Sequence, residues 1–309
     1  MKNALLDIQG KCGCHDKSIS QGLWYCYDIF PPRILSYNAL SPVCDISGLL
    51  PGDTPCVVQV VTEQFLKPPD KRPYNFDNDN PYYKQYDKLM GMGTRNIIKT
   101  VFLNQPKGFF VEAGALDGVY ASNSLELERD LGWTGLLVEP NPVSYKSLLT
   151  KHRKAWTTNA CLSTTSYPKQ TIFVAESDSN PHSEHAMNIK GGTHELGVNI
   201  DDFAVEKEAE DTKEKNYVNV QCFPLRSYLS ALNITQVDLL SLDIQGAEKQ
   251  VLDTLPWETV TFRLLIIENI HQGYDEQFVK DMENKSFRLA HWNKEDYIFM
   301  KQGDIHLDQ

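Results

Sequence analysis

The sequence predicts an α/β fold in which a mostly parallel, Rossmann-like sheet carries helices on both faces and follows an irregular N-terminal extension. Three observations lead to this prediction. From Thr94 onward, apolar strand-like runs alternate with helical stretches, as in a parallel sheet with crossover helices. A glycine-bearing turn joins the first of these strands to a helix. The last two strands have no helix between them, so they should form a hairpin and set one strand antiparallel.

The predicted elements fall into two regions. Residues 1–93 form the extension, because turn residues are frequent there and apolar periodicity is weak, although residues 56–61 read as one strand. Residues 94–309 form the main domain. Its seven predicted strands are 108–113, 135–138, 156–160, 237–242, 264–268, 287–291 and 297–300. Residues 176–219 interrupt the alternation with a long polar stretch, which predicts a lid over the substrate or an insertion.

The first strand-turn-helix-strand unit, residues 108–142, predicts a nucleoside site. Gly114 and Gly118 lie in the turn, where a ligand can approach the backbone because glycine has no side chain. Glu139 follows the next strand, about 20 residues beyond the turn, the spacing at which an acidic side chain accepts hydrogen bonds from both ribose hydroxyls.

The charges beside this turn favour a cationic cofactor over a dinucleotide. Glu112 and Asp117 place negative charge next to the glycines, and the G-x-G-x-x-G pattern of pyrophosphate sites is absent. Carboxylates attract ammonium and sulfonium groups and repel phosphate. The sequence therefore predicts S-adenosylmethionine, bound by Glu112, Gly114, Asp117, Gly118 and Glu139.

The end of the third predicted strand is expected to contact the adenine. It ends beside the Glu139 strand, and ligands of such sheets lie at the carboxyl ends of the strands. Asn159 would accept a hydrogen bond from the adenine amino group, and the backbone of Cys161 would meet a ring nitrogen. The alternative is that Asn159 caps the strand and Cys161 is a core thiol.

Polar residues after the fourth and fifth predicted strands indicate where chemistry takes place. Asp243 follows the fourth strand, and Glu268, Asn269 and His271 lie at or after the end of the fifth. Asp243, Glu268 and Asn269 would suit a magnesium or manganese ion that acidifies a hydroxyl group. Alternatively, His271 would act as a general base. A third interpretation is that Asp243 only caps the next helix.

Four stretches together resemble the FkbM-type methyltransferases. They are FVEAGALDGVYASNSLELERDLGWTGLLVEPNP at 110–142, NACLS at 159–163, LLSLDIQGAE at 239–248 and DYIFMK at 296–301. Within that family the chain is most similar to the invertebrate branch related to protein Star. The resemblance implies a class I methyltransferase fold, S-adenosylmethionine as cofactor, and methylation of a hydroxyl on a sugar, glycan or other small molecule. The chain departs from the family at Gln245, because the family box usually reads LDIEGAE.

A hypothesis from another class stays open beside the enzyme. The chain would then be a Star-like, non-catalytic protein of secretory-pathway trafficking that keeps the methyltransferase fold without turnover. Glu112, Gly114, Asp117 and Glu139 favour the enzyme, since carboxylates at apolar strand ends are costly unless they serve a ligand.

Composition limits the partners. The net charge of −11 argues against nucleic acid, whose phosphates such a surface repels. The chain contains no apolar run of about 18 residues, the length of a membrane span, and charge interrupts the N-terminus too early for a signal peptide. A soluble, cytoplasmic protein is the resulting expectation; the sequence is silent on oligomeric state.

Cysteine placement points to a different compartment. Of seven cysteines, five lie in the first fifth of the chain: Cys12, Cys14, Cys26, Cys44 and Cys56. Clustering suggests disulfides, which together with the family resemblance indicates the endomembrane or Golgi lumen. Reduced buried thiols in a cytosolic protein, or zinc bound by Cys12, Cys14 and His15, are the alternatives.

Overall fold

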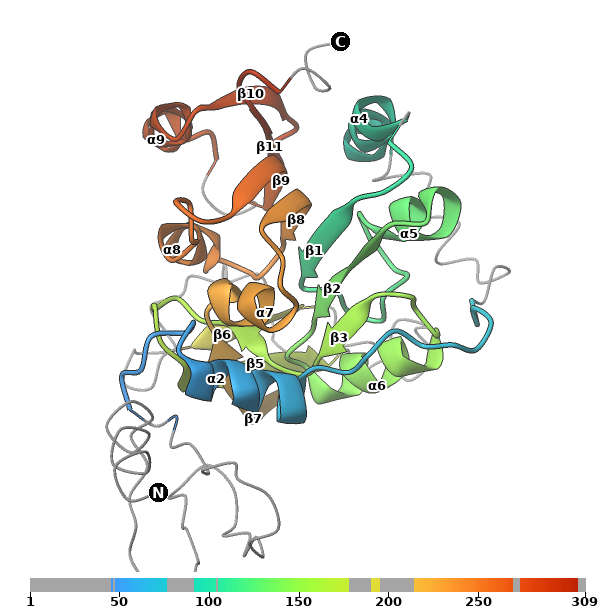
Figure 1. The fold of residues 1–309 in the computed structure, drawn as a ribbon, viewed down its shortest axis with the longest axis vertical. Helices are drawn as coiled ribbons and strands as arrows, with labels where there is room; N and C mark the ends of the chain where they lie inside the picture. Colours follow the sequence, from blue (N-terminus) through green and yellow to red (C-terminus); the bar gives the residue numbers. More distant parts are fainter. Residues whose placement is uncertain are drawn as a thin grey trace, which may run out of the picture.

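The computed structural model describes residues 46, 48–76, 92–103, 105–177, 190–194, 214–268 and 273–304 of the chain. It confirms the predicted α/β fold (Figure 1). The main sheet has seven strands in the order β10-β11-β9-β8-β1-β2-β3. They are β1 (Phe109–Ala113), β2 (Thr134–Val138), β3 (Trp156–Thr158), β8 (Gln236–Leu242), β9 (Thr261–Glu268), β10 (Phe287–Trp292) and β11 (Asp296–Lys301).

Most of the main sheet is parallel, and its last two strands are not. β1 pairs in parallel with β2 and β8, while β2 pairs with β3 and β8 with β9 in the same sense. β11 runs antiparallel to β9 and to β10, which confirms the predicted closing hairpin. Asn293 turns the chain there, because its Oδ1 accepts from the backbone N–H groups of Glu295 and Asp296 at 2.9 and 2.6 Å.

The core has two parts because strand side chains alternate between the faces of the sheet. In β1, Phe109 and Val111 pack on one face and Phe110 on the other. The first face is covered by α2 (Pro55–Val60), α7 (Leu225–Ala231), α8 (Glu248–Asp253) and α9 (Glu276–Asn284). The second is covered by α4 (Met92–Phe102), α5 (Leu125–Leu131) and α6 (Pro142–Thr150). Figure 1 shows α8 and α9 on the opposite side of the sheet from α4 and α5.

The strand predicted at residues 56–61 is wrong. These residues lie in α2 and in the π-helix η1 (Val61–Phe65), which follows it directly. Pro55 begins α2, and Cys56, Val57, Val60 and Val61 are buried on one helical face in the same core as the main sheet. Periodicity does not separate a strand from a buried helix in so short an apolar run, so the pattern was ambiguous.

A second sheet of four strands, in the order β4-β7-β5-β6, was not predicted. It contains β4 (Cys161–Leu162), β5 (Lys169–Ser177), β6 (Lys190–His194) and β7 (Glu214–Phe223). Both ends of the segment predicted as a lid or insertion are therefore strands. Its signal was present in β7, where Val218, Val220 and Cys222 alternate with polar residues. The predicted third strand ends early, at Thr158, because the chain leaves the main sheet for β4.

Two further expectations concern membrane-spanning helices and the N-terminal cysteine cluster. In the described part of the chain, no helix combines the length and the apolar character needed to cross a bilayer. Cys56 is disulfide-bonded. The other cysteines of the N-terminal cluster, and His15, lie outside the described residues.

Candidate functional site

The carboxyl ends of β1, β2, β8 and β9 lie along one edge of the main sheet, because these strands are parallel. The strand order reverses at β1, which has β2 on one side and β8 on the other. Such a switch point is where ligands bind to open α/β sheets. The predicted site residues follow these strands: Gly114 and Asp117 after β1, Glu139 after β2, Asp243 after β8, and Glu268 at the end of β9.

Gly114 and Gly118 shape the turn after β1. Both have positive φ angles, +85° and +76°, which side chains disfavour. A Cβ on Gly114 would lie 1.9 Å from the backbone oxygen of Asp243. The N–H groups of Gly114 and Ala115 donate to the Val138 carbonyl at 3.0 and 3.1 Å. Gly114 thus brings the ends of β1, β2 and β8 into contact, and a larger residue there would displace Asp243.

Glu112 is buried, and its carboxylate binds the turn itself. Its Oε1 accepts from the Asn123 backbone N–H, and its Oε2 accepts from the Ser122 hydroxyl, both at 2.9 Å. The Ser124 hydroxyl also donates to Oε2. The Asn123 amide reaches Ser241 of β8 at 3.0 Å. Glu112 therefore orders the loop that leads into α5.

Asp117 is also fully buried and serves its own turn. Its Oδ1 accepts from the backbone N–H groups of Val119 and Tyr120 at 2.9 and 2.8 Å. Its Oδ2 lies 3.8 Å from the Lys151 ammonium. Glu112 and Asp117 thus have structural partners, which corrects the sequence argument that carboxylates at these strand ends require a ligand.

Sequence reasoning missed Arg153, which lies at the centre of a buried polar network behind the turn. Its Nε is 3.1 Å from both carboxylate oxygens of Glu128 in α5, and neither side chain is exposed. Its other guanidinium nitrogens donate to the Gly118 carbonyl and to the hydroxyls of Ser122 and Ser124. We call Arg153, Glu128, Glu112, Ser122 and Ser124 the Arg153 network. No periodic pattern in the sequence indicates such a contact.

Glu139 is buried at the end of β2. Its Oε2 accepts from the Leu116 backbone N–H and its Oε1 from that of Asn141, both at 2.8 Å. Burial raises the pKa of the Glu139 carboxyl to about 8, although these two hydrogen bonds act in the opposite direction. Asn141 caps α6, because its side chain accepts from the Val143 N–H at 2.9 Å.

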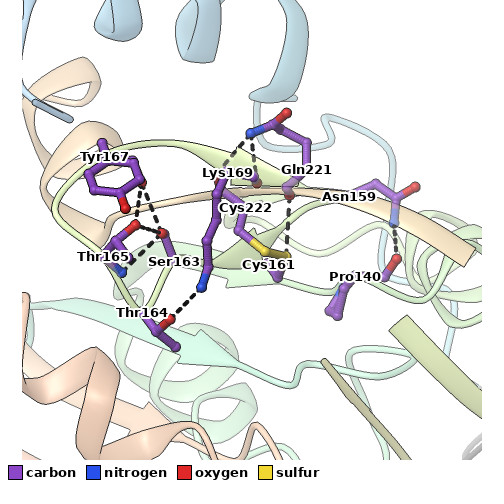
Figure 2. Close-up of a disulfide and its surroundings, with 10 residues drawn as sticks. All are labelled: Pro140, Asn159, Cys161, Ser163, Thr164, Thr165, Tyr167, Lys169, Gln221 and Cys222. Atoms are coloured by element: carbon purple, nitrogen blue, oxygen red, sulfur yellow. Dashed lines mark hydrogen bonds between the residues drawn. A yellow bond between two sulfur atoms is a disulfide. The ribbon is translucent and has the colours of Figure 1, made fainter. Parts of the chain in front are cut away.

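Asn159 and Cys161 follow β3, and Figure 2 shows their surroundings. The exposed Asn159 amide donates to the carbonyls of Glu139 and Pro140 at 2.8 and 3.1 Å, so it joins the ends of β2 and β3. Its Oδ1 points away from Pro140. Cys161 is not the free core thiol of the alternative reading. It forms a disulfide with Cys222, the residue opposite it in β7, and the two Cα atoms are 4.3 Å apart.

Removing this disulfide is expected to destabilise the protein. The bond spans 61 residues of chain, so a Cys161→Ser/Cys222→Ser variant should lose about 2 to 4 kcal/mol of unfolding free energy. Denaturant unfolding of the variant and the wild type measures the difference. Reductant should lower the stability of the wild type more than that of the variant, which keeps the disulfide of Cys56 but lacks the one between Cys161 and Cys222. Equal stability of the two proteins under oxidising conditions would contradict the prediction.

Asp243 and Glu268 are brought together by Gln245. The Gln245 Nε2 donates to Asp243 Oδ1 and to Glu268 Oε2, each at 2.9 Å. Asp243 is exposed and Glu268 half-buried. Burial raises the pKa of Glu268 well above its usual value, and the nearby charge of Asp243 raises it further. The predicted meeting of these two acids at the sheet edge is thus present in the structure.

Asp243 does not cap α8. The N-cap position is Ala247, which makes no side-chain cap. The loop before α8 is closed by Glu248 instead, whose carboxylate accepts from the N–H groups of Ile244 and Gly246 at 2.9 Å. The capping interpretation of Asp243 is therefore wrong, and its carboxylate accepts from the Gln245 side chain instead.

Two residues predicted for chemistry, Asn269 and His271, lie outside the described residues. Among the described residues no group of three or more His, Cys, Asp or Glu side chains could hold a metal ion.

A cavity of about 60 Å³ lies beside Glu268. It is lined by Gly246, Glu248, Lys249, Gln250, Ile267, Glu268 and Phe278.

Comparison with known proteins adds one match. Residues 112–298 match the family described as the methyltransferase FkbM domain. No curated protein and no solved structure matches the chain. The matched region begins in β1 and ends in β11, so it includes Glu139, Asp243 and Glu268.

Proposed function

Because this chain belongs to the FkbM methyltransferase family, we propose that it is an S-adenosylmethionine-dependent O-methyltransferase acting on a hydroxyl of a sugar, glycan or other small molecule. The observation that carries the proposal is the common edge at which Glu139 follows β2 and Asp243 follows β8. On this proposal Glu139 binds the nucleoside and Asp243 the acceptor, on either side of β1 at the switch point of the sheet.

The residues after β1 and β2 fit this cofactor. Each Glu139 oxygen accepts one backbone hydrogen bond and retains a second lone pair for a ribose hydroxyl. The Asn159 Oδ1 would accept from the adenine amino group, and Gly114 and Gly118, with their positive φ angles, form the turn after β1 that would face the cofactor. When bound, S-adenosylmethionine supplies an electrophilic methyl group on a positively charged sulfur.

Asp243 is the residue that we assign to the acceptor. Its carboxylate would accept a hydrogen bond from the acceptor hydroxyl, align the oxygen, and take the proton as that oxygen is methylated. Glu268 also accepts from Gln245 and lines the adjoining cavity together with Phe278 of α9. His271 is the alternative proton acceptor predicted from the sequence.

The competing proposal is a Star-like, non-catalytic trafficking protein. It gains support from Glu112 and Asp117, which have structural partners and would be retained without a ligand. Calorimetric titration with S-adenosylmethionine separates the two proposals. Binding favours the enzyme, whereas absence of binding by folded protein eliminates it.

Replacing Glu139 with alanine should weaken S-adenosylmethionine binding about ten-fold to a hundred-fold. Charge-assisted hydrogen bonds to the ribose contribute about 1.5 to 3 kcal/mol, and each 1.4 kcal/mol is about ten-fold in affinity. The same titration measures the change. Unchanged affinity together with a lower melting temperature would show that Glu139 only holds the backbone of Leu116 and Asn141.

The pKa of Glu139 adds a pH dependence to this prediction. Below a pKa of about 8 the ligand-free carboxyl is mostly protonated, and only the carboxylate accepts from both ribose hydroxyls. Affinity for adenosine, which lacks the ammonium and sulfonium groups, should therefore rise as pH increases towards 8 and level off above it. A Glu139→Gln variant should bind weakly and show no rise. The same rise in that variant would assign the pH dependence to another group.

The disulfides also indicate the cellular compartment in which the chain folds. Disulfides persist in oxidising compartments and are rare in the reducing cytosol. With Cys161–Cys222 joined and Cys56 in another disulfide, we infer that the chain folds in an oxidising space such as the endomembrane lumen. Alkylating thiols at the moment of cell lysis tests this inference, because modification of Cys161 and Cys222 would place the protein in a reducing compartment.

A further inference from the structure

Gln245 contacts both acids of the acceptor site. Its Nε2 lies 2.9 Å from Asp243 Oδ1 and 2.9 Å from Glu268 Oε2. Both partners are carboxylate oxygens, so the NH₂ end of the amide faces them and each of its hydrogens has one acceptor. The side chain therefore links the carboxyl groups of Asp243 and Glu268 through its two hydrogens.

The backbone around Gln245 holds it in this position. Gln245 has a φ of +58° and Gly246 a φ of +105°, so two consecutive residues adopt conformations that most side chains disfavour. Glu248 fixes the loop by accepting from the N–H groups on either side of Gln245, those of Ile244 and Gly246. A loop closed in this way presents the Gln245 side chain to the sheet edge rather than to the helix that follows.

A hydrogen-bond donor in contact with both Asp243 and Glu268 does not fit the magnesium or manganese site predicted from the sequence. A divalent cation between Asp243 and Glu268 would take their oxygens as ligands, and hard cations prefer oxygen. The amide places its two hydrogens, which carry partial positive charge, at the point where such a cation would lie, and an amide N–H cannot coordinate a cation. The ammonium group of Lys249, which lines the adjoining cavity, pairs with Asp275 at 2.7 Å.

We propose that Gln245 is a positioning residue that bridges Asp243 and Glu268 in place of a cation, so that the acceptor hydroxyl is aligned without a divalent metal. This inference rests on the proposed methyl transfer for its consequence, but the bridge itself can be tested apart from turnover. A glutamate at position 245 would add a third carboxylate where the amide now lies. Three carboxylates at one point form a cation site, because their repulsion is relieved by an ion.

Titration with Mn²⁺, followed by electron paramagnetic resonance, tests the bridge in the full chain. Gln245→Glu should bind Mn²⁺ at least about ten-fold more tightly than the wild type. Gln64→Glu is the matched control, because it adds the same charge at an exposed position of η1 and should leave Mn²⁺ binding as in the wild type. Adding Asp243→Asn to Gln245→Glu should remove the gain.

Two results would overturn the inference. The first is Mn²⁺ binding by the wild type that Asp243→Asn abolishes, since a cation would then displace the amide. The second is a Gln245→Glu variant that folds and gains no Mn²⁺ affinity, since the side chain would then not lie between the acids. Neither measurement needs S-adenosylmethionine, so failure of the proposed function appears separately, as absence of cofactor binding.

Turnover gives the readout that distinguishes positioning from a structural role. On an acceptor that the wild type methylates, Gln245→Ala should lower kcat about ten-fold with KM and S-adenosylmethionine affinity nearly unchanged. A chelator should leave wild-type kcat unchanged. Loss of S-adenosylmethionine affinity in Gln245→Ala would instead show that Gln245 maintains the structure of the sheet edge. Wild-type turnover that a chelator abolishes would show that the reaction depends on a metal ion.

Discussion

An Asp243→Asn variant is expected to lose at least about a hundred-fold in turnover while binding S-adenosylmethionine as the wild type does. Asparagine keeps the shape and the oxygen that accepts from Gln245, but it cannot take a proton from the acceptor hydroxyl. The fold should survive the change, because the Asp243 side chain is exposed and does not cap α8. Formation of S-adenosylhomocysteine with a panel of sugar acceptors measures turnover, and calorimetry measures cofactor affinity.

Asp253→Asn is the matched control for this variant. It removes the same charge from an exposed position in α8 and should leave turnover at the wild-type level. Normal turnover in Asp243→Asn would show that the assignment of Asp243 is wrong. If His271→Ala is inactive at the same time, the proton acceptor is His271.

The largest loss of stability is expected from Arg153→Met. Methionine fills much of the same space, but it leaves the buried Glu128 carboxylate without its cation and removes donors from Gly118, Ser122 and Ser124. Breaking a buried ion pair by removing one partner costs about 3 to 5 kcal/mol. Denaturant unfolding, followed by circular dichroism, measures the change.

Two further variants separate charge burial from other causes. Adding Glu128→Leu to Arg153→Met should restore part of the lost stability, because the unpaired buried charge is then gone. Lys280→Met breaks the exposed Lys280–Glu276 pair on α9 and should change stability little. If Arg153→Met is as stable as Lys280→Met, the buried pair contributes nothing to folding.

Most of the main sheet could be predicted because its strands carry strong local signals. β8 and β9 are mostly apolar, with Asp243 directly after β8 and Glu268 at the end of β9, and the closing hairpin contains an asparagine at its turn. Residues 56–61 were misassigned because a short apolar run suits a strand and a buried helix equally. The second sheet was missed because β5, β6 and β7 are separated by long polar segments, and pairing across such distances has no local signature.

The candidate site was likewise predicted only in part. Glu139, Asp243 and Glu268 could be placed from the sequence, since parallel strands bring their carboxyl ends to one edge. Which partners each acid has could not be placed, because side-chain contacts depend on packing. The hydrogen-bond partners of Glu112 and Asp117 within the turn were therefore not foreseen. Gln245 was interpreted only as a departure from the family box, not as the contact between two acids.

The Arg153 network also has an evolutionary consequence. Its members satisfy one another's polar groups, because Arg153 pairs with Glu128 directly and shares the hydroxyls of Ser122 and Ser124 with Glu112. A mutation in one member leaves another without its partner, so single changes should be removed by selection while paired changes survive. Relatives that lack the arginine should therefore also lack the acid of α5, and this covariation would join two positions 25 residues apart in the chain.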